Sequence, residues 1–155
     1  MKPIKIFNGN VLDNILLGIE DTVENVVKFC QEYGFEKFIA ELPQGYATIL
    51  GEEGINLSGG QKQIIALARA LRKNPQFLIL DEATAAMDRN TEKFTMDLLL
   101  KLKNEIAVLF ISHRLHTLKN NADRIYVLEN GSISEKGNHE TLLKTSNFYS
   151  DYWTI

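Results

Sequence analysis

Two short and wholly apolar segments limit most strongly what this chain can fold into. They are FLIL (residues 77–80) and AVLFI (residues 107–111), and between them lies TEKFTMDLLLKLKN (residues 91–104), where apolar residues recur at helical spacing. Strands without alternating polar residues are typical of a parallel sheet that helices cover on both faces, with right-handed crossovers between strands. We therefore predict a doubly wound α/β core from about residue 75 onward.

The first half of the chain has a different, mostly helical character. Residues 11–74 contain the amphipathic stretches VLDNILL, TVENVVKFCQEY, FEKFIAEL and KQIIALARALRKNP. This predicts a helical subdomain over about residues 11–74 and an α/β part over about residues 75–155. The second part continues after AVLFI with a short helix (113–120), two strands (124–129 and 132–136) joined by a tight Asn130-Gly131 turn, and a last helix over HETLLK.

Composition and charge exclude several classes of protein. The chain has 155 residues, of which 45% are hydrophobic and 24% charged, and its net charge is −3, so it fits one soluble globular domain without a basic nucleic-acid footprint. Its single cysteine, Cys30, argues for a reducing intracellular setting, and its helical context predicts a small core residue. No apolar run reaches the roughly 18 residues of a membrane span, and the start has no signal-peptide pattern. We expect contact with a membrane only through a partner.

The segment LSGGQ (residues 57–61) opens the last helix of the first half with two glycines. Ser58 and Gln61 match a capping box, which explains those two residues. It does not explain Gly59 and Gly60, because each glycine in a helix costs about 1 kcal/mol relative to alanine. A helix N-terminus offers free N–H groups to an anion, and glycines let a phosphate come close. We therefore predict that this turn docks against a phosphate.

Polar residues follow both apolar strands directly. Asp81 and Glu82 come after FLIL, and Ser112 and His113 come after AVLFI. The carboxyl ends of parallel strands share one sheet edge, where ligands bind. There Asp81 suits Mg²⁺, Glu82 suits a general base acting on water, and His113 suits a phosphate oxygen. The alternative is that acids simply end a strand and a histidine caps a helix, and the two sites together favour function.

The motifs LSGGQ (57–61), FLILDEAT (77–84), AAMD (85–88) and ISHR (111–114), in this order, resemble the nucleotide-binding domain of an ABC transporter. LSGGQ is similar to the signature motif, FLILD to the Walker B strand, Glu82 to the catalytic carboxylate, AAMD to the D-loop and His113 to the switch histidine. FNGNVLDNI (7–15), the loop Gly51-Glu52-Glu53-Gly54 and GNHETLL (137–143) resemble exporters in particular. Ile64 and Ala85 depart from the usual arginine and serine.

This resemblance implies a P-loop NTPase-like (RecA-like) parallel sheet core with an inserted ABC α-helical subdomain. The core is expected to be incomplete, because the sequence contains no G-x-x-x-x-G-K-[ST] phosphate loop (Walker A). The Q-loop glutamine would fall at Met1 or Lys2. We therefore expect residues 1–155 to be the C-terminal portion of a nucleotide-binding domain that begins just after the Q-loop.

The resemblance also implies a mechanism, in which two nucleotide-binding domains close head-to-tail around ATP. Asp81 would help to hold Mg²⁺, Glu82 would activate the attacking water, and His113 would contact the γ-phosphate. The other residues expected to contact the nucleotide are Leu57, Ser58, Gly59, Gly60, Gln61 and Asp88. Closure would drive the transmembrane domains of an exporter at the cytoplasmic face of the inner membrane. The chain alone, without Walker A, is expected to be inactive as an ATPase.

Several alternatives stay open at this point. The segment FNGNVLDNI resembles exporters of peptides and bacteriocins, with lipid or drug export as competing substrates. A soluble ABC-type protein of chromosome maintenance or translation would share the signature and Walker B, but we find no long heptad pattern and no basic surface for nucleic acid. A non-catalytic regulatory half-domain is a further reading, against which the retained Glu82 and His113 argue.

Overall fold

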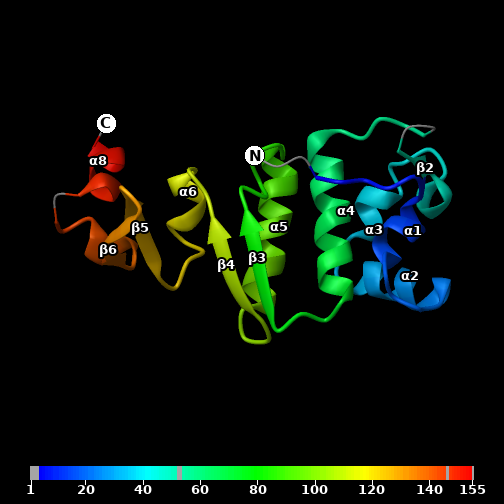
Figure 1. The fold of residues 1–155 in the computed structure, drawn as a ribbon, viewed down its shortest axis with the longest axis horizontal. Coiled ribbons are helices and arrows are strands. Elements are labelled where there is room, and N and C mark those ends of the chain that lie inside the picture. The colour runs from blue at the N-terminus through cyan, green and yellow to red at the C-terminus, as the bar shows by residue number, and fades with distance from the viewer. Residues whose placement is uncertain (1–3, 52–53, 146, 155) are drawn as a thin grey trace. The chain divides into compact units, whose positions relative to one another are not determined.

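The computed structural model describes residues 4–51, 54–145 and 147–154. They belong to two compact units, Met1–Phe110 and Ile111–Ile155, each described here by itself, and Figure 1 traces the chain through its elements. The expected Q-loop position and Glu52-Glu53 of the exporter-like loop lie outside the described residues. Within the described ranges, no helix combines the length and hydropathy that crossing a membrane requires.

The first unit begins with the predicted helices, each shorter than its sequence pattern and the third only half as long. They are α1 (Val11–Leu16), α2 (Val23–Glu32) and α3 (Glu36–Ile39). A 3₁₀ turn, η1 (Gly45–Ala47), and a short antiparallel pair, β1 (Gly9–Asn10) with β2 (Ile49–Leu50), were not expected from the sequence. The β1–β2 pair brings the start of α1 next to the segment that precedes the LSGGQ helix.

Helix α2 follows from its sequence pattern. The Thr22 hydroxyl accepts a hydrogen bond from the Asn25 N–H at 3.2 Å and so caps the helix. Val26 and Cys30, one turn apart, are both fully buried. The prediction that Cys30 is a small core residue is confirmed.

A buried polar network attaches the start of the chain to the LSGGQ helix. Asn14 is 1% exposed, and its amide donates to the carbonyl oxygens of Phe7 (2.9 Å) and Asn10 (3.1 Å). Its Oδ1 accepts from the Phe7 N–H at 2.9 Å and from Arg69 Nη2 at 3.0 Å. Arg69 Nε also donates to the Asn14 carbonyl at 2.7 Å. Because every polar atom of the Asn14 amide is paired, its burial is stabilising.

Helix α4 (Gly59–Arg72) is the LSGGQ helix, and its predicted limits are confirmed. One apolar face is buried, comprising Ile64, Ile65, Leu67, Ala68 and Leu71. Arg72 forms an ion pair with Asp21 near the end of the helix. The chain then turns at Asn74, which has a φ of 49°, and Pro75 prevents continuation. The subdomain boundary expected near residue 74 stays a prediction.

The predicted strand–helix–strand unit is present. Strand β3 (Phe77–Asp81) leads through helix α5 (Arg89–Leu102) to strand β4 (Ala107–Ile111), and the two strands pair side by side with their arrows in the same direction (Figure 1). Leu78 and Leu80 are buried in one core with α5 residues. Phe77 and Ile79 on the other face are 55% and 57% exposed.

This exposure corrects the expectation that helices cover both faces of these strands. Within the described residues, helical side chains bury the Leu78–Leu80 face, and the opposite face remains open. Successive strand side chains point to opposite faces, so a single covering layer buries only alternate residues. An all-apolar strand therefore indicates that both of its faces suit burial. It does not show that helices of this chain pack against both faces.

The second unit has a smaller core of its own. It contains α6 (Leu115–Leu118), β5 (Ile125–Glu129), β6 (Ser132–Gly137), α7 (His139–Leu142) and α8 (Phe148–Thr154). The predicted Asn130-Gly131 hairpin is confirmed, with both residues at positive φ and β5 antiparallel to β6. The expectation that the helix over HETLLK is the last one is wrong, because α8 follows it. The Tyr149 hydroxyl and His139 Nδ1 are 2.9 Å apart and join α8 to α7.

Candidate functional site

The glycine turn, residues 57–61, has the predicted capping box. The Ser58 hydroxyl accepts from the Gln61 N–H at 3.2 Å, and the Gln61 side-chain oxygen accepts from the Ser58 N–H at 2.9 Å. Capping uses a lone pair of the Ser58 hydroxyl, so its proton can still be donated to a ligand. The N–H groups of Gly59 and Gly60 lie in the first helical turn, where no preceding helical carbonyl accepts them. The turn can therefore donate several hydrogen bonds to an anion.

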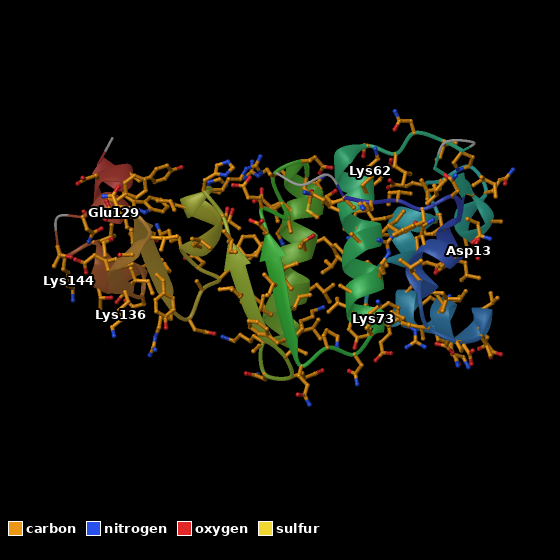
Figure 2. The ribbon with its side chains drawn as sticks, in the orientation of Figure 1. Asp13, Lys62, Lys73, Glu129, Lys136 and Lys144 are labelled. Atoms are coloured by element: carbon orange, nitrogen blue, oxygen red, sulfur yellow. The ribbon has the colours of Figure 1, made fainter. Side chains whose placement is uncertain are left out.

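Positive charge lies close to this turn. Lys62 follows it at the same end of α4, while Lys73 marks the opposite end of the helix (Figure 2). Lys62 Nζ lies 3.5 Å from the Asn56 side-chain oxygen, just before the turn. The lysine and the helix dipole both favour an anion at the N-terminal end of α4.

The structure supplies a second reason for one of the two glycines, which the sequence analysis missed. A Cβ atom placed on Gly59 would lie 2.6 Å from the Cβ of Ala86, so alanine does not fit there without a shift. A Cβ on Gly60 would meet the Ala86 carbonyl oxygen at 3.5 Å and Met87 Cα at 3.6 Å, which is ordinary contact. Packing within the chain therefore requires Gly59 but not Gly60. The only sequence signal for it was the pair of small residues in AAMD.

The acidic turn, residues 81–88, begins where β3 ends. Asp81 is exposed at the last position of the strand, and Glu82 is half-buried with a φ of 50°. A left-handed backbone is uncommon for glutamate and persists where surrounding contacts hold it. The Ala85 N–H donates to the Glu82 carbonyl at 3.0 Å, and the Met87 N–H donates to the Thr84 carbonyl at 3.1 Å. These bonds fold the chain sharply after the strand.

A cavity of about 390 Å³ lies between the N-terminal part of α4 and the acidic turn, and Gly59 is the residue of the glycine turn that lines it. Its walls are α4, β3 and the acidic turn, and its lining includes Gly59, Lys62, Gln63, Asp81 and Glu82. Two motifs that lie some twenty residues apart in the sequence thus meet at one place. Leu57, which we also predicted to contact nucleotide, is buried and belongs to the core of the first unit.

Asp88 has a defined structural role as the N-cap of α5. Its carboxylate accepts from the Asn90 N–H at 2.8 Å, the Thr91 N–H at 3.0 Å and the Thr91 hydroxyl at 2.8 Å. The bonds from Thr91, foremost the one from its backbone, lower the pKa of Asp88. Capping explains this aspartate without a ligand, so nucleotide contact by Asp88 stays a prediction.

His113 lies in the second unit, two residues after β4, and its side chain is exposed. The turn around it is fixed by a hydrogen bond from the Arg114 N–H to the Ser112 hydroxyl at 2.9 Å. Glu82 and His113 belong to different units, and their serving one site stays a prediction.

Comparison with known proteins identifies the family. A model of the family described as "ABC transporter" matches residues 6–85, just over half of the chain. Over 156 residues the chain is 40% identical to the ATP-dependent lipid A-core flippase of Haemophilus influenzae (strain 86-028NP), covering 99% of the chain and 26% of that protein. Over 148 residues it is 45% identical to the leukotoxin translocation ATP-binding protein LktB of Mannheimia glucosida, covering 95% of the chain and 21% of that protein.

A solved structure agrees with these relatives. The chain matches a bacterial Atm1-family ABC exporter with ATP bound at a TM-score of 0.88 and 36% identity, covering 99% of the chain and 27% of the exporter. The chain thus spans between 21% and 27% of the length of these relatives, and its fold is that of a P-loop NTPase. It belongs to the ABC transporter family, with exporters among its relatives and the ATPase domain as the part to which it corresponds.

Proposed function

We propose that this chain is a working part of the ATPase motor of a membrane exporter, at the cytoplasmic face of the membrane. The observation that carries the proposal is that Asp81 ends β3 and Glu82 follows it directly, while the capped glycine turn presents its N–H groups at the start of α4. Phosphoryl transfer depends mostly on positioning and charge stabilisation, and these groups supply anion donors and carboxylates. The exporters among the relatives support coupling of ATP hydrolysis to transport.

Most of the predicted site residues receive a role in this proposal. Glu82 orients the attacking water and accepts its proton. The exposed Asp81 carboxylate matches the oxygen ligands that Mg²⁺ prefers, and a metal ion bound with ATP would neutralise phosphate charge. His113 donates to the γ-phosphate. Ser58, Gly59, Gly60 and Gln61 donate to the γ-phosphate of an ATP held by a second nucleotide-binding domain, arranged head-to-tail.

The proposal requires a phosphate loop from elsewhere, because the sequence has no G-x-x-x-x-G-K-[ST]. We propose that a polypeptide segment outside residues 1–155 supplies this loop and that transmembrane domains of the same transporter receive the motion. Residues 1–155 alone then neither bind MgATP productively nor hydrolyse it.

The transported substrate is a finer part of the proposal. We infer a peptide-like cargo, supported by the FNGNVLDNI segment and by a relative named for leukotoxin translocation. Another relative is named as a lipid A-core flippase, so lipid is the competing substrate class.

Two experiments test the motor function. Calorimetry and an ATPase assay on the purified chain should show no MgATP binding and no turnover. A chimera should then be made in which this chain replaces the matched stretch of the Haemophilus influenzae flippase. We expect this chimera to hydrolyse ATP, and Glu82→Gln to reduce turnover at least about 100-fold, the usual weight of a general base.

The matched control is Glu41→Gln, which makes the same change of charge at an exposed position outside the cavity. It should leave turnover unchanged. Glu82-dependent hydrolysis by the isolated chain would refute the need for a second polypeptide segment. A folded chimera with no ATPase activity would refute the motor function itself.

A further inference from the structure

Gln63 is a buried polar residue whose position the predicted mechanism does not use. It lies on the second turn of α4, is 4% exposed, and lines the cavity beside the acidic turn. Its Nε2 lies 3.5 Å from the carbonyl oxygen of Glu82, at the outer limit of a hydrogen bond. Its Oε1 has no hydrogen-bond partner among the described residues.

Half-satisfied burial of an amide is unfavourable for folding. A buried polar atom without a partner loses its water and gains nothing in return. An apolar side chain of the same length would fill the space without that penalty. A residue that breaks a packing rule in this way, next to a candidate site, calls for a functional reason.

The partner of Gln63, Glu82, has an unusual backbone conformation. Glu82 has a φ of 50°, so the direction in which its side chain leaves the main chain depends on how the neighbouring peptide is held. Its carbonyl accepts from the Gln63 amide at 3.5 Å and from the Ala85 N–H at 3.0 Å. The first comes from α4 and the second from within the acidic turn.

Helix α4 therefore holds the acidic turn at both ends. Gly59 packs against Ala86 near one end, and Gln63 reaches the Glu82 carbonyl at the other. Both contacts lie within the first unit and come from adjacent turns of the same helix. A movement of the glycine turn would be transmitted to Glu82 through these two contacts.

We propose that Gln63 is a positioning residue, which sets the direction of the Glu82 carboxylate by holding its main-chain carbonyl and so links it to the glycine turn. This inference rests on the proposed role of Glu82. It adds a residue that acts through Glu82 rather than on the nucleotide. The unpaired Oε1 lowers the stability of the fold. Removing it should therefore leave stability unchanged or higher while Glu82 loses its positioning, so that stability and activity can be separated.

The test variant is Gln63→Met, which keeps the length of the side chain and removes both polar atoms. The matched control is Gln76→Met, the same change at an exposed position before β3. For the purified chain we expect the urea midpoint of Gln63→Met to equal or exceed that of the wild type. Amide exchange at Ala85, measured by NMR, should become about tenfold faster as the turn loosens.

The kinetic test uses the flippase chimera that carries this chain. Gln63→Met should lower kcat between about tenfold and a hundredfold, as expected for a displaced catalytic group, and leave KM within about twofold. Gln76→Met should change neither. A residue that only supported folding would lower stability and activity together, which is the opposite of this pattern.

Unchanged exchange at Ala85 in Gln63→Met overturns the proposal, whatever the chimera does. An unchanged kcat in an active chimera overturns it too. If the wild-type chimera lacks ATPase activity, the proposed motor function is refuted. The exchange data on the purified chain still test whether Gln63 holds the acidic turn. Gln63→Leu repeats both measurements with a second apolar shape if the methionine variant does not fold.

Discussion

Gly59 and Ala86 pack so closely that a Cβ atom added to Gly59 would lie 2.6 Å from that of Ala86. One residue opens the LSGGQ helix and the other lies in the acidic turn after β3. This packing explains Gly59 within the chain, while its part in keeping the helix N-terminus open to an anion stays a prediction. Alanine substitutions at Gly59 and at its neighbour Gly60 can separate the effect of packing from the effect of ligand contact.

Gly59→Ala should destabilise the fold by about 1–3 kcal/mol, the usual range for overpacking. Urea unfolding of the purified chain measures this change. Gly60→Ala is the matched control and should be neutral or stabilising, since its added Cβ makes only ordinary contacts and alanine favours the helix. Ala86→Gly in the Gly59→Ala background should recover part of the loss, and no recovery would contradict the proposed clash.

Asn14→Ala should destabilise the first unit by about 2–4 kcal/mol, because it leaves buried main-chain groups and the Arg69 guanidinium without partners. Urea midpoints report the effect. Asn25→Ala removes an exposed amide and should change stability by no more than about 0.5 kcal/mol. Equal effects of the two substitutions would mean that the network does not hold the N-terminal segment in place.

Cys30 should be an unreactive thiol in the folded chain. It is fully buried, and burial is the main cause that raises its pKa from 9.0 to about 11. The thiol of the unfolded chain ionises first as the pH rises, so the folded state should lose stability progressively between these two values. Modification by a disulfide reagent at pH 8 should be slow in buffer and rapid in denaturant. Rapid modification of the folded chain would show that α2 opens readily.

Asp88 should make the chain sensitive to acid. Its pKa is lowered by the Thr91 and Asn90 bonds, so its cap stabilises the fold above the ordinary carboxylate pKa and is lost as the pH falls through the lowered value. The measurement is the urea midpoint from pH 6 down to strong acid. Asp88→Asn keeps a good helix cap that does not titrate, and its midpoint should fall less steeply. Parallel curves for the two proteins would rule out this contribution.

Local sequence patterns were enough for most of the elements. The capping box of Ser58 and Gln61, the Asn130-Gly131 hairpin and the strand that ends in Asp81 depend on residues a few positions apart, and the structure has all three. The family was recognisable for the same reason, because its motifs are short and contiguous. The acidic residues and the glycine turn were therefore predictable as candidates from their own neighbours along the chain.

Other features depend on the path of the chain through space. The contact of Gly59 with Ala86, the bond between Asn14 and Arg69, and the reach of Gln63 to Glu82 each join residues from different elements, and no local pattern signals them. The open face of β3 is of the same kind, since an apolar strand shows that its side chains suit burial but not which segment buries them. Sequence by itself determined most of the helices and strands, the Asn130-Gly131 turn and the candidate chemistry, because those follow from spacing of a few residues. Tertiary structure alone decided which of these residues touch, because long-range packing sets those distances.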